Sequence, residues 1–231
     1  MSADLVAFFD PMQVVDNTGI LLKGAGMTLL LSAAAVGLAA VIGGLLGVMR
    51  GSSSRLVSWS SRVYVEIIRG TPLLVQMYML YYGFPSLGIT LSAFAAAAVA
   101  LANNSGAYTA EIVRAAVQSI ERSQPESARA LGMGYWTAYW RVIVPQALPI
   151  ALPALVGEVV DIVKWSALAS VVVVPEATQV VYQIVGRSYR GFGSLFLSLA
   201  VFYLLVTASV AAVSRRVERR MTRYRLRVAH A

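Results

Sequence analysis

The 231-residue sequence contains no cysteine and a single histidine, His230. Without thiols the chain has no disulfide, no thiolate metal site and no cysteine nucleophile. Charged residues are also scarce, at 13% of the chain, whereas ordinary soluble domains carry about a quarter. These shortages leave no recognisable catalytic set and no metal-ligand cluster. We therefore expect no catalytic residue, no metal and no cofactor bound by this chain itself.

Two further patterns are missing. No glycine loop of the Walker type is present, so hydrolysis of ATP by that route is not expected. A transport protein with this sequence would draw its energy from an ion gradient or from a separate ATPase subunit. Residues 1–16 contain three aspartates and no basic residue, which is the opposite of the basic start of a secretory signal peptide. This segment is either an interfacial amphipathic helix or a disordered tail.

Hydrophobic residues are abundant instead, at 58% of the sequence, with a mean hydropathy of +0.69. Average domains contain about 45–50% apolar residues, so we expect an integral membrane protein. Its net charge of +8 lies mainly at the ends of apolar runs, as in the cytoplasmic flanks of membrane helices. Membrane lipid is therefore an expected partner, and nucleic acid is not.

Five apolar runs divide the sequence. A helix rises about 1.5 Å per residue, so about 20 residues cross a hydrocarbon core of about 30 Å. The first run is rich in glycine and alanine, and small residues let membrane helices approach closely. We predict an all-α integral membrane bundle of about five transmembrane helices, near 24–49, 63–83, 89–120, 147–174 and 192–213. The second run is interrupted at 69–72.

Positive charge predicts the orientation. Arginines concentrate at 50–62, at 114–141 and after 214, whereas residues 1–16 and the turn at 83–88 carry no basic residue. Because cytoplasmic loops are enriched in Lys and Arg, we expect the N-terminus outside and the C-terminus in the cytoplasm. The predicted parts are a periplasmic segment at 1–18, a membrane domain at 19–214 and a basic cytoplasmic tail at 215–231 that contacts anionic lipid.

A polar island, residues 123–134, lies on the predicted cytoplasmic side. Ser123 and Glu126 have the spacing of a capping box, and Pro125 fits the first turn of a helix. Gly132 is a typical helix stop. A helix of about eight residues is marginal alone in water. We therefore expect the island to pack against the inner face of the bundle or against a cytoplasmic protein.

The fourth run contains Glu158, Asp161 and Lys164, with Trp165 and Ser166 beside them. Three-residue steps put successive side chains on nearly one helical face, and Asp161 can pair with Lys164. Each ionisable group at membrane depth costs roughly 2.5–3.5 kcal/mol on insertion scales and usually faces a cavity or a partner. This face is either a polar pathway for substrate or a structural ion pair within the bundle.

Three prolines, Pro145, Pro149 and Pro153, precede this charged face. Each removes one backbone hydrogen bond from a helix. The resulting bend either starts the fourth run with a simple kink or transmits motion from the polar island to the charged face.

The residues Glu126-Ser127-Ala128 with Gly132, followed by VPQA at 144–147, resemble the EAA motif in the membrane subunits of ATP-binding-cassette (ABC) importers. Other stretches are similar to the polar amino acid permeases of that family, the branch that includes the histidine and glutamine systems. They are RGTPLLVQ at 69–76, YYGFP at 81–85, SGAYTAEIVR at 105–114 and ALGM at 130–133. The similarity extends from about residue 26 to residue 220, and four blocks in one order make it specific.

The resemblance implies a permease subunit in a bacterial inner membrane that translocates a polar amino acid or a related small polar compound. The polar island would be a coupling helix in a groove of a cytoplasmic ATPase, through Glu126, Ser127, Ala128, Arg129 and Gly132. Two permease subunits would form the pore, and an ATPase dimer below them would bind ATP and Mg²⁺. An extracytoplasmic binding protein would deliver the substrate. The chain itself would be a transport subunit and not an enzyme.

The sequence departs from the family pattern at the fourth run. The family commonly has Asn at the position of Gly157 and Asp at that of Trp165, and some members bind amino acid in the membrane near this run. It also usually has Ala at the position of Ser127. Either this chain is the non-binding half of a heterodimer, which we favour over a homodimer, or its substrate is bulkier or differently charged. The candidate substrate pathway comprises Gly157, Glu158, Asp161, Lys164, Trp165 and Ser166.

A stand-alone channel or an ion-driven secondary transporter is the alternative class. The charged face of the fourth run supports it, but such folds commonly contain an internal repeat, and none is apparent here. Uptake that follows an ion gradient rather than ATP would identify this class. An intramembrane enzyme would need a catalytic pair, which the sequence does not offer.

Overall fold

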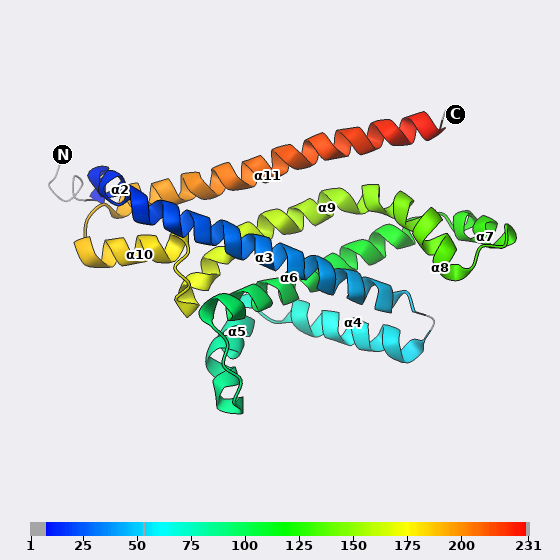
Figure 1. Ribbon diagram of the computed structural model, residues 1–231, viewed down its shortest axis with the longest axis horizontal. Helices are drawn as coiled ribbons and strands as arrows, with labels where there is room; N and C mark the ends of the chain where they lie inside the picture. The colour runs from blue at the N-terminus through cyan, green and yellow to red at the C-terminus, as the bar shows by residue number, and fades with distance from the viewer. Residues whose placement is uncertain (1–7, 53, 230–231) are drawn as a thin grey trace. The chain divides into compact units, whose positions relative to one another are not determined.

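The computed structural model describes residues 8–52 and 54–229, with side chains through residue 217. Every regular element in these ranges is a helix (Figure 1), which confirms the all-α class. The longer helices are α3 (Thr18–Arg50), α4 (Arg55–Gly70), α6 (Ala93–Gln118), α9 (Val144–Trp165), α10 (Ala177–Ser188) and α11 (Phe192–Ala229). The shorter elements are α2 (Met12–Asp16), α5 (Leu73–Tyr78), α7 (Ser123–Ala130) and α8 (Tyr135–Ala138), the π-helical turns η1 (Met79–Gly83) and η3 (Tyr139–Ile143), and the 3₁₀ turns η2 (Phe84–Leu87) and η4 (Ser166–Val172).

Within the described residues, three helical stretches are long and apolar enough to cross a membrane. They are Thr18–Arg50, Tyr135–Val172 and Phe192–Val217. They contain the first and last predicted runs and all of the fourth except its final two residues. The other two predicted runs are helical as well, in α6 and in α4 with α5. The count of five spans and the orientation of the termini stay predictions.

Pro72 produces the interruption predicted in the second run. Its backbone is extended, with φ −62° and ψ 133°, so α4 ends at Gly70 and α5 starts at Leu73. Proline has no amide hydrogen for a helical hydrogen bond, and it disfavours helical geometry in the residue before it.

The chain forms two compact units. Unit 1 contains the chain up to Leu38, Thr71–Ala102 and Val160–Ser209, and unit 2 contains Ala39–Gly70, Asn103–Val159 and the chain from Val210. Within unit 2, glycine lets α3 and α6 cross in close contact. A Cβ atom on Gly43 would collide with the side chain of Thr109, and one on Gly106 would collide with the side chain of Ile42. The close packing expected of the glycine-rich first run is therefore present.

Within unit 1, α10 packs against the beginnings of α3 and α11. Its buried apolar cluster consists of Val180, Val181, Ile184 and Leu195. Gly24 of α3 faces Val180 without room for a Cβ atom. This packing fixes α10 in unit 1 through apolar contacts on two sides.

The N-terminal segment packs onto the loop between α10 and α11. The Ser194 hydroxyl donates to the carbonyl of Asp10 at 2.7 Å, and Arg190 Nη2 lies 3.6 Å from Asp10 Oδ2. The rings of Phe8 and Phe192 have their centroids 5.6 Å apart. Residues 8–16 therefore contact α11 and the loop before it and contain the short helix α2, whereas the choice between an interfacial helix and a tail stays a prediction. The part of the segment at 1–7 lies outside the described residues.

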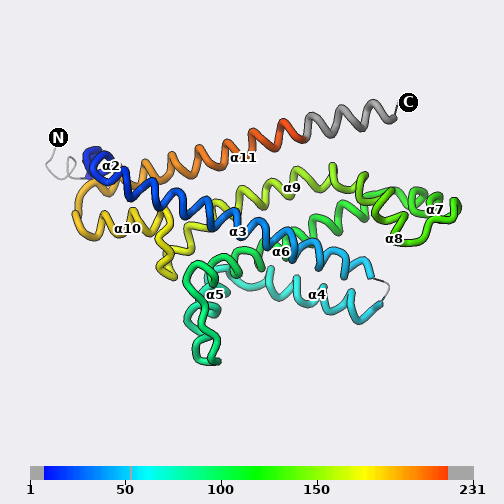
Figure 2. Tube along the Cα trace, in the orientation of Figure 1, coloured from blue at the N-terminus to red at the C-terminus, as the bar shows by residue number. Residues whose placement is uncertain are grey.

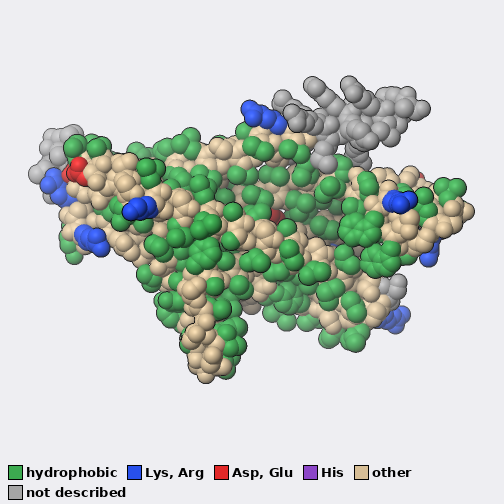
Figure 3. All heavy atoms as spheres, in the orientation of Figure 1, with side chains coloured by type: hydrophobic (Ala, Val, Ile, Leu, Met, Phe, Trp, Pro, Cys, Tyr) green, Lys and Arg blue, Asp and Glu red, His purple; other side chains and the backbone are tan. Residues whose placement is uncertain are grey.

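Large hydrophobic side chains remain exposed along the apolar helices. Leu30 and Leu45 of α3 and Leu204 and Leu205 of α11 are 58–66% exposed, and hydrophobic side chains dominate the face seen in Figure 3. A surface of this kind suits contact with lipid rather than water. The helix α11, Phe192–Ala229, extends beyond residue 213, where the last predicted run ends. His230 lies outside the described residues.

Candidate coupling surface and substrate pathway

The polar island forms α7, an exposed helix in unit 2. Ala128 is its only buried residue, at 3% exposure, whereas the other predicted coupling residues face outward. Leu131, directly after the helix, is 79% exposed. An apolar side chain so exposed beside a polar helical face is typical of a surface that another protein covers. The exposed coupling residues are Glu126, Ser127, Arg129 and Gly132.

The end of α7 follows the prediction, but its beginning does not. Gly132 has a φ of +79°, and the amide of Met133 donates to the carbonyl of Ala128 at 3.1 Å. Together with the bond from Gly132 to Arg129, this is a Schellman ending, which requires the left-handed backbone that glycine adopts easily. The predicted capping box is wrong. The helix starts one residue earlier than a Ser123 cap requires, and Arg122 precedes it without a side-chain cap.

The α7 helix is held against neighbouring segments of unit 2. It lies beside α8 and η3 (Figure 1), and Gln146 Nε2 donates to Gln124 Oε1 at 3.2 Å. The hydroxyl of Tyr135, at the start of α8, donates to the carbonyl of Gly51 at 3.1 Å. The first bond connects the polar island to the start of α9, and the second connects α8 to the residue that follows α3.

A cluster of charges joins α3, α4 and α6 in the same unit. Glu111 of α6 forms ion pairs with Arg50 of α3 and with Arg114 one turn along its own helix. The guanidinium of Arg69, at the end of α4, lies 4.8 Å from the centre of the Tyr108 ring, which is a cation–π distance. The sequence analysis placed four of these residues in motif blocks without assigning their contacts. Arg50 is 61 residues from Glu111, and nothing in the sequence pairs them.

The predicted pathway residues fall on one side of α9. Gly157, Glu158, Asp161 and Lys164 are exposed or half-buried, whereas Val163 on the opposite side is buried. The Lys164 ammonium lies 3.4 Å from Asp161 Oδ1, so the predicted pairing is present. We call the residues Gly157, Glu158, Asp161 and Lys164 the α9 polar face. Trp165, the last residue of α9, is half-buried.

Ser166 differs from the other predicted pathway residues because it is fully buried. It begins η4, and its hydroxyl donates to the carbonyl of Val163 at 2.7 Å. Ser166 therefore stabilises the turn from α9 into η4 and does not face a solvent-filled space.

The prolines of the fourth run lie at and after a change of helix type. The π-helical turn η3 comes directly before α9, and Pro145 is the second residue of α9. Pro149 and Pro153 lie inside the helix. Proline cannot donate a backbone hydrogen bond, and π-turns commonly mark such irregular points. The irregular start of α9 is therefore present, whereas its role in transmitting motion stays a prediction.

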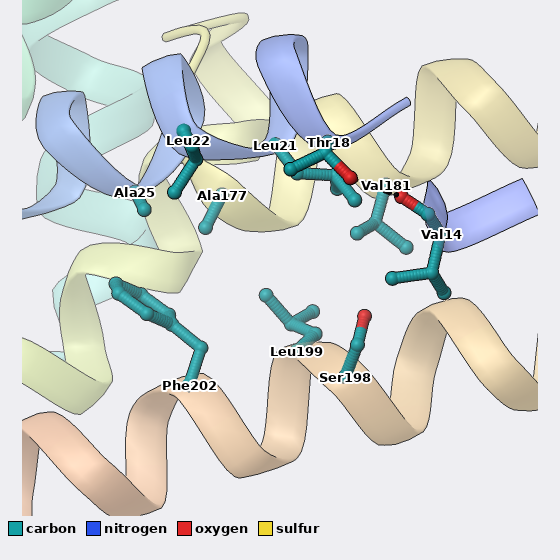
Figure 4. A pocket seen from close by; sticks show the side chains of 10 residues that line it. All are labelled: Val14, Thr18, Leu21, Leu22, Ala25, Ala177, Val181, Ser198, Leu199 and Phe202. Atoms are coloured by element: carbon teal, nitrogen blue, oxygen red, sulfur yellow. Dashed lines mark hydrogen bonds between the residues drawn. The ribbon is translucent and has the colours of Figure 1, made fainter. Parts of the chain in front are cut away.

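A cavity of about 210 Å³ in unit 1 has the wrong chemistry for a polar substrate. Apolar side chains from α2, α3, α10 and α11 point into it, among them Leu21, Leu199 and Phe202 (Figure 4). Thr18 and Ser198 also line it, but the Thr18 hydroxyl donates to the carbonyl of Val15 in α2 and the Ser198 hydroxyl to that of Leu195 in α11. A zwitterion would lose its hydration there without gaining hydrogen bonds.

A buried carboxylate, Glu176, lies in unit 1 between η4 and α10. Its side chain is fully buried and accepts hydrogen bonds from the amides of Thr178 at 2.9 Å and Gln179 at 2.8 Å. It also accepts one from the Tyr203 hydroxyl at 3.1 Å. The sequence analysis assigned no role to Glu176. The sequence signal that could have indicated it is a glutamate that follows four valines and a proline, directly before a helix.

The described residues form helices with surfaces suited to lipid, an exposed polar helix and a charged face on a long apolar helix. These features are typical of a membrane transport subunit. The family described as the inner membrane component of binding-protein-dependent transport systems matches residues 20–223, and the chain belongs to this family. It is therefore a permease subunit of an ABC importer in the inner membrane. In the described residues no group of three His, Asp or Glu side chains could hold a metal ion.

Relatives cover nearly the whole chain. The probable amino-acid ABC transporter permease protein YckA of Bacillus subtilis is 35% identical over 94% of this chain and 95% of its own length. The glutamine transport system permease protein GlnP of Escherichia coli is 36% identical over 92% and 98%. A crystal structure of an amino acid ABC transporter with histidines matches with a TM-score of 0.85 and 37% identity, over 91% and 98%. The methionine transporter MetNI shares the fold, with a TM-score of 0.74.

Proposed function

We propose that this permease subunit carries an amino acid across the inner membrane, with energy from ATP hydrolysed on a separate cytoplasmic subunit. The relatives support this substrate class, because their names specify glutamine, arginine and L-cystine. The structural match to an amino acid transporter supports it as well. A small polar substrate also fits the charge on the α9 polar face better than it fits the apolar cavity of unit 1.

The observation that carries the proposal is the exposed α7 helix. Glu126, Ser127, Arg129 and Gly132 face outward while Ala128 anchors the helix to unit 2. A helix of eight residues is too short to be stable alone, and within unit 2 it is supported by the bond of Gln124 to Gln146 and by the burial of Ala128. We assign its outer side to a groove of an ABC ATPase dimer, which would hold ATP and Mg²⁺.

The α9 polar face is the proposed substrate pathway. Asp161 and Lys164 could bind the ammonium and the carboxylate of an amino acid in turn, by exchanging their mutual ion pair for pairs with the substrate. Their side chains are 41% and 55% exposed, so the exchange needs no unfolding of α9. Trp165 next to Lys164 would limit the size and shape of the side chain that passes.

The other pore subunit is proposed to be a different permease chain. Gly157 and Trp165 stand where the resembling family carries an amide and a carboxylate, so a second subunit with those groups would complete the site. A binding protein outside the membrane would deliver the substrate, as the name of the family implies.

Glu126→Lys tests the coupling role. The complex is purified through a tag on this chain and reconstituted in liposomes, and ATP-driven uptake of radiolabelled L-glutamine and L-arginine is measured. Reversal of a charge in the docking surface should lower uptake and ATPase stimulation roughly tenfold or more, while the chain stays in the membrane. Ser60→Ala, at an exposed serine of α4 outside the polar island, is the control and should retain both activities.

Unchanged ATP-driven uptake in Glu126→Lys would contradict the docking assignment. Uptake that follows an imposed ion gradient, without ATP, would instead favour a secondary transporter and would overturn the proposed energy source.

A further inference from the structure

A short turn connects η4 with α10 in unit 1 (Figure 2). Val173, in this turn, has a φ of +61°. A β-branched residue in the left-handed region is a genuine outlier, and such strain persists only where surrounding contacts hold it. The amide of Glu176 donates to the carbonyl of Val174 at 2.8 Å across Pro175. The chain therefore reverses within a few residues, and Glu176 stands at the end of the reversal.

The Glu176 side chain connects this turn to three helices. It is the N-cap of α10, where its two oxygens accept the amides of Thr178 and Gln179. On α11, the Tyr203 hydroxyl donates to Glu176 Oε2. On α3, Thr28 Oγ1 lies 3.4 Å from the same oxygen and accepts the amide of Ala177 at 3.0 Å. One carboxylate thus fixes the start of α10 to both of its neighbours.

The network also reaches the end of the α9 polar face. Along the chain the turn continues back into η4, where the amide of Val173 donates to the carbonyl of Ser170 at 3.0 Å. At the other end of η4, the Ser166 hydroxyl bonds to the carbonyl of Val163 in the last turn of α9. Lys164 lies two residues before Ser166 in the chain. A displacement of Glu176 would therefore change the support of the segment that presents Lys164.

We propose that Glu176 is a positioning residue of the translocation pathway. Its carboxylate fixes the end of the strained turn to α3, α10 and α11 and, through η4 and Ser166, sets the orientation of Lys164 at the end of the α9 polar face. Glu176 is fully buried, so it acts through these neighbours without touching the substrate. The consequence for transport rests on the proposed function, whereas the positioning of Lys164 by Glu176 depends only on contacts within unit 1.

Glu176→Gln tests this role most directly, because the groups around the carboxylate donate hydrogen bonds to its two oxygens from fixed positions. Glutamine is isosteric, but its amide nitrogen is only a donor. On one side it would face the amide of Gln179, and on the other the amide of Thr178 and the Tyr203 hydroxyl. Either orientation leaves a buried donor without an acceptor.

The natural sequence has no cysteine, so a single Lys164→Cys substitution gives a unique thiol that reports the local position. The rate of its modification by a water-soluble thiol reagent is measured in the purified detergent-solubilised complex, with and without Glu176→Gln. We expect the rate to change roughly fivefold or more, as for loss of a buried charged hydrogen bond. A cysteine at the exposed Ser86 should react at the same rate in both backgrounds.

Thr207→Ala is the matched control, because the Thr207 hydroxyl bonds only to carbonyls of α11, one turn beyond Tyr203. It should leave the Lys164→Cys rate unchanged. An unchanged rate in Glu176→Gln would overturn the inference. If that variant does not assemble, Tyr203→Phe carries the same test, with a smaller change expected.

Uptake measurements distinguish the positioning of Lys164 from the proposed substrate pathway. A changed thiol rate with slower L-glutamine or L-arginine uptake in Glu176→Gln supports both the positioning and the pathway. A changed rate with wild-type uptake keeps the positioning and contradicts the pathway assignment.

Discussion

Asp161 and Lys164 form the ion pair that sequence spacing predicted, at 3.4 Å, with 41% and 55% of their side chains exposed. An exposed pair of this kind contributes little to stability in water, at about 0–1 kcal/mol. Within a membrane, however, ionisable groups are retained mainly where they face a cavity or a partner. The Asp161–Lys164 pair therefore adds little stability, although its charges are costly to insert into a membrane. This difference favours a role in transport.

We predict that Asp161→Asn and Lys164→Met change uptake or substrate preference without loss of the folded complex. Each substitution removes one charge that an amino acid could bind, so the uptake rate for individual substrates should change by roughly fivefold or more. Initial uptake rates for a panel of radiolabelled amino acids provide the measurement. Lys23→Met, which removes an exposed lysine from α3, is the control. Wild-type kinetics in both α9 variants would leave only a structural pair.

Gly157→Asn tests the departure from the family pattern. A Cβ atom at Gly157 would meet nothing within 4 Å, so the larger side chain fits without repacking, and helix propensity favours the replacement of glycine. We expect normal assembly and an altered ranking of substrates in competition assays of uptake. An identical ranking would mean that position 157 does not contribute to specificity.

Part of the site could be predicted from sequence, and the reason is periodicity. Spacings of three and four residues placed Glu158, Asp161 and Lys164 on one helical face, because neighbours along a helix follow from its geometry. Contacts between distant segments were not accessible in this way. Glu176 contacts Thr28, 148 residues away, and such a pairing depends on how helices pack.

At the scale of elements, α7 combines one prediction that holds with one that fails. Its C-terminal stop at Gly132 was predictable because few residues other than glycine adopt a positive φ easily. Its capping box was not formed, since the chain from Glu121 already turns helically before Ser123, with the amide of Gln124 bonded to the carbonyl of Glu121 at 3.0 Å. Local capping motifs are weak when the preceding turn is continuous with the helix.

We predict that Gly132→Ala weakens coupling by loosening the end of α7. Alanine in the left-handed region costs roughly 1–2 kcal/mol, so the last turn should exchange its amide hydrogens faster, and ATPase stimulation should fall. Hydrogen exchange and ATPase assays on the reconstituted complex measure the two effects. Gly134→Ala is the control, because Gly134 has a φ of −63° and open space around it. Equal behaviour of the two variants would contradict the argument.

On the scale of the whole molecule, composition and apolar runs were enough to predict an all-α membrane protein, and the motif blocks were enough to predict its family. Both predictions are confirmed. The second predicted run is the instructive exception. It is divided by Pro72 into α4 and α5, and α4 alone carries a polar and an apolar side, so simple hydropathy describes it poorly. The number of spans therefore cannot be counted from apolar runs alone.

We predict that the purified complex contains a second, different permease. A tag on this chain should co-purify an ABC ATPase and a permease that carries Asn and Asp at the positions of Gly157 and Trp165. Mass spectrometry of the complex from native membranes identifies both. Co-expression of two differently tagged copies of this chain is the complementary measurement. If one tag recovers the other, with no second permease present, the protein is a homodimer.

The crossing of α3 and α6 at Gly43 and Gly106 has a mechanical consequence. Side chains between two helices act as a compliant layer that can absorb small displacements by changing rotamer, and at this crossing the glycines remove that layer. The two backbones should therefore move as one stiff body, so that a displacement of the C-terminal half of α6 is passed to α3 almost undamped. Alanine at Gly43 would act as a wedge between the helices, and it would change the stiffness of unit 2 before it changed any chemistry.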